Sequence, residues 1–140
     1  MADPVSDGGE KSLTTLLSTL STALHPSTFV FVTLSEASAL PALSEIQLMF
    51  RESEGITIIT TQEYAVRQNM EYSFPSRMIT LNVHSSLEAV GFMAVIATKL
   101  AKKGMGVNPV SGFYHDHLFV PVGREEEALR TLQELSEENK

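Results

Sequence analysis

The chain has 140 residues, of which 43% are hydrophobic and 19% are charged. This length fits one compact domain or two small units that share a core, and the composition excludes disorder over most of the chain. The chain contains no cysteine, which excludes disulfides, thiol nucleophiles and cysteine-based metal sites. Its net charge of −7 argues against nucleic acid as a partner, because the phosphate backbone is also negative.

The N-terminal residues show no targeting signal. Residues 1–10 include Asp3, Asp7 and Glu10 and lack the basic start and apolar core of a signal peptide. No run approaches 18 consecutive apolar residues, so we expect no membrane span and no membrane partner. We therefore expect a cytoplasmic protein whose residues 1–10 form a disordered tail.

The first predicted element is a helix that begins after residue 10 and stops before Pro26, which disfavours helical geometry at the preceding residue. The surrounding serines and threonines are mediocre helix formers, so this helix needs burial of its apolar stripe. Five leucines make up that stripe: Leu13, Leu16, Leu17, Leu20 and Leu24.

The remainder of the first half reads mainly as strands. Residues 28–34 are β-branched and aromatic, which is typical of a buried strand. After a connector, residues 47–53 and 56–61 flank Gly55 and predict a hairpin. A short helix is expected over 62–70.

The second half begins with an alternating strand over 77–83. Ser85 and Glu88 have the spacing of a capping box, so the pattern predicts a helix that begins there and ends before Gly104. Gly91 falls inside this predicted helix.

Two strands and a final helix complete the second half. The strands are expected over 107–113 and 118–122, joined by a turn at 114–117. The final helix follows Gly123, with three glutamates in its first turn.

The resulting order, β-α-β-β-α in the second half and a looser version in the first, predicts an α+β fold. We expect two units in tandem, each with a mostly antiparallel sheet and helices on one face. Residues 11–74, including the N-terminal helix, form the first unit, and residues 75–140 form the second.

Four segments carry a resemblance to a known family. Ile79–Phe92 and Gly112–Val122 resemble tandem ACT-domain proteins once catalogued only as a domain of unknown function, as do Leu24–Phe31 and Met49–Thr57. The resemblance covers about residues 12–135. It implies two ferredoxin-like βαββαβ units without catalytic machinery, which bind an amino acid or similar metabolite beside a neighbouring unit.

The chain is also distantly similar to Castor-type arginine sensors, whose ACT units carry a similar aspartate-histidine turn before a valine-proline strand. One departure from the common ACT pattern concerns Gly91, since no aspartate precedes it in the loop. The ligand contacts that ACT domains make with this loop therefore do not transfer residue by residue to this chain.

We expect the candidate ligand site between the 83–91 loop and the facing unit, with the 114–117 turn as a candidate second wall. Free amides at a helix start can hold a carboxylate. The resemblance suggests that Asp116 pairs with an ammonium group, with Glu88 as a second candidate. Alternatively, Asp116 only accepts backbone amides within its turn. The candidate ligand-binding residues are His84, Ser85, Ser86, Leu87, Glu88, Val90, Gly91, Tyr114, His115 and Asp116.

Two other kinds of site are disfavoured. His115 and His117 share a strand face, but His84 is the only nearby third ligand and the spacing is weak support, so no metal site is expected. His84, Ser85 and Asp116 lack the nucleophile elbow of a hydrolase. We therefore expect no catalytic residue, no enzymatic activity and no cofactor.

The sequence thus predicts a regulatory module that binds a small molecule, with an amino acid as the ligand class. The alternative is a structural or protein-interaction module without a ligand. Sheet edges are commonly paired or covered, so a homodimer is a further expectation.

Overall fold

A computed structural model describes residues 2–140 and shows an α+β protein. The contacts divide the chain into two compact units. Unit 1 is discontinuous and consists of residues up to His25 together with Met78–Lys140, whereas unit 2 is Pro26–Arg77. Within residues 2–140, no helix is both long and apolar enough to cross a bilayer.

The sheet has six strands in the order β2-β3-β1-β4-β6-β5. Strands β1 (Thr22–Leu34) and β4 (Ser73–Leu81) each contain a boundary between the two units, so both units use them. The order β2-β3-β1-β4 in unit 2 and β1-β4-β6-β5 in unit 1 is the four-strand order of a ferredoxin-like fold.

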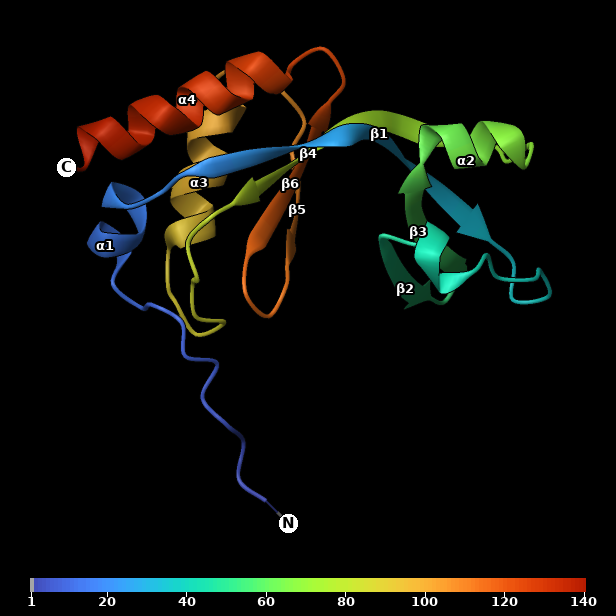
Figure 1. The fold of residues 1–140 in the computed structure, drawn as a ribbon, viewed down its shortest axis with the longest axis horizontal. Coiled ribbons are helices and arrows are strands. Elements are labelled where there is room, and N and C mark those ends of the chain that lie inside the picture. The colour runs from blue at the N-terminus through green and yellow to red at the C-terminus, as the bar shows by residue number, and fades with distance from the viewer. Residues whose placement is uncertain (1) are drawn as a thin grey trace. The chain divides into compact units, whose positions relative to one another are not determined.

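Unit 2 is built on a hairpin (Figure 1). Strands β2 (Leu48–Glu52) and β3 (Gly55–Thr61) pair antiparallel, and β3 also pairs antiparallel with β1. A Cβ at Gly55 would lie 2.6 Å from the carbonyl oxygen of Leu34, so the close approach of β1 requires glycine there. The predicted hairpin is confirmed.

Two short helices accompany this hairpin. Helix α2 (Gln62–Arg67) follows β3 directly and contacts it, and the hydroxyl of Thr61 caps it by accepting a hydrogen bond from the amide of Tyr64. A 3₁₀ turn, η1 (Leu43–Glu45), lies in the connector before β2. The small core of unit 2 contains Val30, Val32, Ile58 and Ala65.

In the described part of unit 1, three helices contact one another (Figure 1). These are α1 (Leu13–Ser18), α3 (Phe92–Ala101) and α4 (Glu125–Glu138), and α4 also contacts β6 (Asp116–Pro121). Strand β5 (Asn108–Ser111) pairs antiparallel with β6. The buried core of unit 1 includes Leu16, Leu17, Leu20, Ile79, Leu81, Phe92, Ile96, Leu100, Leu118, Val120, Leu132 and Leu135.

The predicted N-terminal helix is wrong beyond Ser18. Helix α1 ends there, and β1 begins at Thr22 and runs through Pro26. Weak helix formers fill this segment, so the extended pairing in the sheet prevails over the helical pattern. The burial pattern itself is confirmed, because all five leucines of the stripe belong to the core of unit 1 or pack against it.

The predicted capping box is also wrong. Helix α3 begins at Phe92, with Gly91 as its N-cap at a φ of 91°. The hydroxyl of Ser85 donates to Asp116, and the amide of Glu88 donates to the hydroxyl of Ser86. These contacts hold residues before Gly91 in a loop.

The predicted turn at 114–117 is shorter in the structure. Asp116 and His117 belong to β6, and the amide of Gly112 donates to the carbonyl of His115 to close the turn between β5 and β6. Asp116 is therefore fixed by strand pairing opposite Ser111.

Candidate functional site

The loop between β4 and α3 and the turn between β5 and β6 enclose a small cavity of ≈ 110 Å³. Both segments belong to unit 1. A single water needs about 10–15 Å³ measured in this way, so the cavity has room for a group of several non-hydrogen atoms. Its lining residues are Ser85, Ser86, Leu87, Ala89, Phe92, Met93, Ser111, Gly112 and Asp116.

Asp116 is the buried charged group of this cavity, with a relative exposure of 7%. Its Oδ2 accepts a hydrogen bond from the Ser85 hydroxyl at 2.9 Å, and its Oδ1 accepts one from the Ser111 hydroxyl at 2.6 Å. In the described part of the chain, no cationic side chain forms an ion pair with this carboxylate. Buried carboxylates are usually paired with a cation, so this arrangement is unusual.

The loop before α3 presents two hydrogen-bond donors to a second carboxylate. The amide of Leu87 donates to Oδ2 of Asp7 at 2.7 Å, and the hydroxyl of Ser86 donates to the same oxygen at 3.0 Å. The amide of Gly9 donates to Oδ1 of Asp7 at 2.8 Å. Hydrogen bonds from the Gly9 and Leu87 amides lower the pKa of Asp7 below its usual value.

The backbone next to Asp7 pairs with the same loop. Glu10 and Ser85 form a parallel bridge, in which the Glu10 amide donates to the His84 carbonyl at 2.7 Å and the Ser86 amide donates to the Glu10 carbonyl at 2.9 Å. This differs from the expectation of a disordered tail over residues 1–10, because residues 7–10 lie against the loop. The sequence offered no local signal for a contact this far along the chain.

The histidines near the cavity have separate roles. The ring of His84 lies 5.3 Å from the ring of Tyr114, and Nδ1 of His115 pairs with the Val83 carbonyl at 3.2 Å. Nδ1 of His117 pairs with the Thr80 hydroxyl at 2.9 Å. The pKa of His117 is lowered, mainly by burial and to a smaller extent by the nearby His115. Within residues 2–140, no cluster of three or more histidine, aspartate or glutamate side chains has the arrangement of a metal site.

The structure brings together four of the sequence-predicted site residues: Ser85, Ser86, Leu87 and Asp116 all line the cavity. The other six lie around it without lining it. Glu88 is exposed and pairs with Lys11, Val90 is 84% exposed, and Gly91 caps α3. His84, Tyr114 and His115 contact one another or the loop backbone, as described above.

The sequence interpretation missed the other lining residues and Asp7. Ser111 and Gly112 lie just before the turn that leads into β6. The sequence signal for Ser111 was a hydroxyl opposite an aspartate across a predicted hairpin. Phe92 and Met93 are the first two residues of α3 and also line the cavity. Asp7 is too distant from Leu87 in the sequence for any local pattern to link the two residues.

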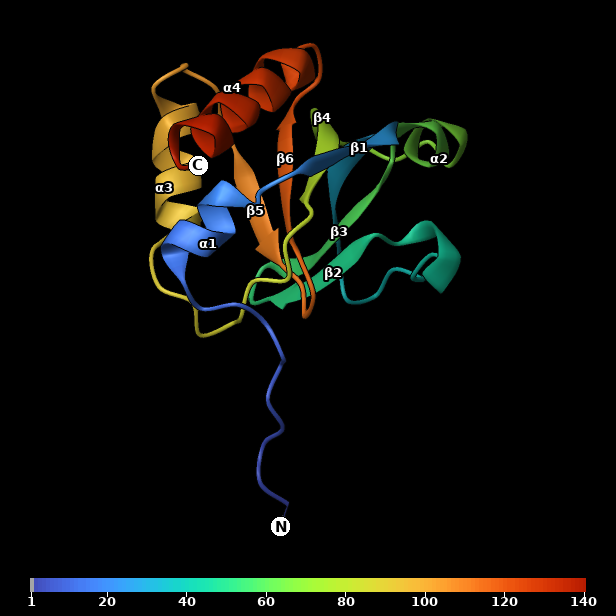
Figure 2. The same cartoon turned by 60° about the vertical axis from the view of Figure 1, so that its left-hand side comes forward.

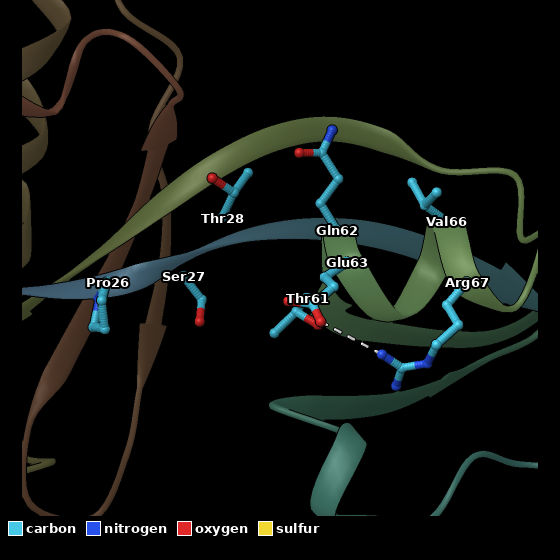
Figure 3. A pocket seen from close by; sticks show the side chains of 8 residues that line it. All are labelled: Pro26, Ser27, Thr28, Thr61, Gln62, Glu63, Val66 and Arg67. Carbon is cyan, nitrogen blue, oxygen red and sulfur yellow. Dashed lines mark ion pairs between the residues drawn. The ribbon is translucent and has the colours of Figure 1, made fainter.

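Unit 2 has a wider groove of ≈ 740 Å³ between β1 and α2 (Figure 3). Its charged groups already pair with each other: Arg67 lies 3.6 Å from Glu63 and 3.9 Å from Glu45, and it stacks over the Tyr64 ring. Because these groups are satisfied and largely exposed, the groove does not define the chemistry of a ligand. The groove is lined by Pro26, Ser27, Thr28, Thr61, Gln62, Glu63, Val66 and Arg67.

Two sequence profiles described as ACT domain match this chain, one over residues 8–77 and the other over residues 73–134. The chain therefore belongs to the ACT-domain family and carries two ACT domains in tandem. ACT domains are generally regulatory modules that bind small molecules such as amino acids, rather than catalytic domains. The two matches overlap at the start of β4, the strand that both units use.

Solved structures share this fold. A Vibrio cholerae protein of unknown function, described as a possible transport protein, is 40% identical, with a TM-score of 0.77 over 90% of this chain and 97% of its own. An Agrobacterium tumefaciens protein is 18% identical, with a TM-score of 0.70 over 84% and 89% of the two chains. The ligand-free regulatory subunit of aspartate kinase from Thermus thermophilus is 10% identical, with a TM-score of 0.63 over 85% and 97%. No curated protein sequence matches this chain.

Proposed function

We propose that this protein is a regulatory module that binds a free amino acid in the cavity between the 85–87 loop and Asp116. The observation that carries the proposal is the Asp116 carboxylate, which is buried and accepts hydrogen bonds from two serine hydroxyls. A carboxylate can accept about four hydrogen bonds, so this group retains capacity for an ammonium. An ammonium would also supply the compensating charge that a buried carboxylate favours.

The same cavity offers donors for the other end of an amino acid. The Leu87 amide and the Ser86 hydroxyl already bind a carboxylate, that of Asp7, at 2.7 and 3.0 Å. Phe92 and Met93 provide apolar wall. A volume of ≈ 110 Å³ suits the ammonium, Cα and carboxylate, with a larger side chain extending toward the solvent.

The comparisons support the regulatory part of the proposal. The chain consists of tandem ACT domains, and its fold is shared by the regulatory subunit of an aspartate kinase. Binding would therefore alter the behaviour of a partner rather than drive a reaction on the ligand. We further propose that the protein forms a homodimer, which light scattering at several concentrations tests; a constant monomer mass would contradict it.

Thermal denaturation with each of the twenty amino acids tests the ligand. A ligand present at about 100 times its Kd stabilises the protein by about 2.7 kcal/mol, which raises Tm measurably. We expect at least one amino acid to produce this rise. If no amino acid raises Tm, the protein is better explained as an interaction module without a ligand.

The variant Asp116→Asn tests the site. It keeps the size of the side chain and one acceptor oxygen, so it costs about 1–3 kcal/mol in stability and abolishes the ligand-induced rise in Tm. The matched control is Ser111→Ala, which removes one hydrogen bond to the same carboxylate but keeps the charge. Retained amino-acid binding by Asp116→Asn would contradict the assignment.

A further inference from the structure

The segment Asp7–Glu10 lies along the loop before α3 (Figure 2). It is fitted closely, because a Cβ at Gly9 would lie only 2.4 Å from the Ser86 amide nitrogen. Two backbone hydrogen bonds of 2.7 and 2.9 Å join Glu10 to His84 and Ser86. The segment therefore makes a defined contact with the loop that lines the cavity.

The Asp7 carboxylate uses the donors that a bound amino acid would need. Both the Leu87 amide and the Ser86 hydroxyl donate to its Oδ2. These donors cannot serve Asp7 and the carboxylate of a ligand in the same way at the same time. An aspartate is charged at neutral pH, and the lowered pKa of Asp7 extends the charged form to more acidic pH.

One feature of this contact favours its release. Nε2 of His84 is buried and has no hydrogen-bond partner within residues 2–140. The segment contributes to covering this ring, since a Cβ at Gly8 would lie 3.7 Å from its Cε1. An unsatisfied buried nitrogen opposes the closed arrangement, and exposure to water would satisfy it.

The ion pair that follows the segment, between Lys11 and Glu88, adds little to the stability of this contact. Lys11 pairs with Glu88 at 3.2 Å, but the two side chains are 66% and 77% exposed. Exposed ion pairs contribute little to stability. Release of the segment is therefore opposed chiefly by the hydrogen bonds of Asp7 and Glu10.

We propose that Asp7–Glu10 is an intramolecular competitor, in which the Asp7 carboxylate occupies the carboxylate-binding donors of the site until an external carboxylate displaces it. This inference rests on the proposed function and adds a regulatory step to it. Ligand binding then releases the segment from the loop. The state of the site is thereby coupled to the position of the N-terminal segment.

The amide resonance of Leu87, observed by NMR on ¹⁵N-labelled protein, tests the competition. The probe is sodium acetate at constant ionic strength, with acetamide as the uncharged comparison. In Asp7→Ala we expect acetate to shift this resonance at a concentration about tenfold lower than in the native chain. Acetamide is expected to have no effect. The control Asp3→Ala makes the same charge change at an exposed residue and is expected to behave as the native chain does.

A second variant releases the segment without removing the carboxylate. Gly9→Ala places a Cβ against the Ser86 backbone, so it forces the segment away from the loop while Asp7 remains. We expect the same gain in acetate affinity. Equal acetate affinity in the native chain and both variants overturns the competition, and so does an unchanged Leu87 resonance in all of them.

The amino-acid panel, repeated on Asp7→Ala, separates this inference from the proposed function. If amino acids raise Tm equally in the native chain and the variant, the site binds them and the competition is wrong. If acetate competes as expected but no amino acid raises Tm in either protein, the segment contact stands and amino-acid binding is wrong.

Discussion

Asp116 and His117 are neighbours on β6 with different surroundings. Successive side chains of a strand point to opposite faces, so Asp116 lines the cavity while His117 pairs with Thr80 on β4. The two side chains therefore have different hydrogen-bond partners. His117 contacts the sheet, whereas Asp116 belongs to the candidate site.

His117 makes stability depend on pH. Burial, together with the nearby His115, lowers its pKa below the ordinary value of 6.5. Between the folded pKa and 6.5 the unfolded chain binds the proton and the folded chain does not, so stability rises with pH in this window. The contribution of His117 is thus present above 6.5 and is lost as the pH falls toward the folded pKa.

We expect the fall in Tm below about pH 6.5 to become shallower in His117→Asn. Thr80→Ala is the matched control, because it removes the same hydrogen bond but no titrating group, and it should lower Tm similarly across this range. Thermal denaturation over a pH series measures both. An equal slope in His117→Asn and the native chain would contradict the assignment.

Asp7 makes stability depend on pH in a more acidic range than His117 does. Because its folded pKa is below the ordinary aspartate value of about 3.9, its contribution is present above that value and is lost as the pH falls through the folded pKa. His84 is the nearby basic group and favours the charged form of Asp7 when protonated. We expect the protection of the Leu87 amide, relative to its intrinsic exchange rate, to fall as Asp7 protonates, and Asp7→Ala to remove this pH dependence. Hydrogen exchange measures both.

At the scale of elements, local chemistry determined which parts of the fold could be predicted. The β2–β3 hairpin and α4 follow from Gly55 and from an amphipathic run with glutamates in its first turn, and both are confirmed. The start of α3 could not be predicted, because the hydroxyl of Ser85 binds Asp116 and its backbone pairs with Glu10. Those partners are remote in sequence.

The same distinction applies to the candidate site. The sequence interpretation chose Ser85–Leu87 as the donors of a helix start and Asp116 from a family resemblance, and the structure brings these residues to one cavity. The helix start that was expected to hold a carboxylate is a loop instead. Its donors remain, since a free amide and a hydroxyl need no helix to bind an anion.

Gly91 sets the beginning of α3. Its φ of 91° lies in the region that disfavours residues with a Cβ, so Gly91→Ala should cost about 1–2 kcal/mol. Space is not the cause, because the nearest atom to the new Cβ is Leu13 Cδ2 at 3.6 Å. Chemical denaturation measures the loss.

Gly106→Ala is the control for Gly91→Ala. Gly106 lies outside the left-handed region, and a Cβ there meets no described atom within 4 Å. We expect a change within about 0.5 kcal/mol. Similar losses for the two variants would show that backbone conformation at Gly91 is not the determinant.

At the scale of the whole molecule, the two units have cores of different size. Among the described residues, six apolar side chains are buried in unit 2 and sixteen in unit 1. Regions with fewer buried apolar contacts open more readily. We therefore expect amides of β3 to exchange faster than those of α3.

Ile58→Ala tests this difference. Ile58 is fully buried in unit 2, and its truncation should cost about 2–5 kcal/mol. Hydrogen exchange should then accelerate more in β3 than in α3. The matched change in unit 1 is Ile96→Ala, which is also fully buried and should accelerate exchange in α3. Equal acceleration throughout the chain in both variants would show a single cooperative unit instead.

Unit 2 is inserted within unit 1, and this has a consequence for synthesis on the ribosome. The leucines of residues 13–24 emerge first, but their core partners Ile96, Leu118 and Leu132 emerge only after the whole of unit 2. Unit 2 is contiguous and can form while these leucines still lack their partners. The nascent chain therefore exposes a leucine-rich segment for most of its translation, which makes this segment a natural binding site for a chaperone that holds unfolded chains.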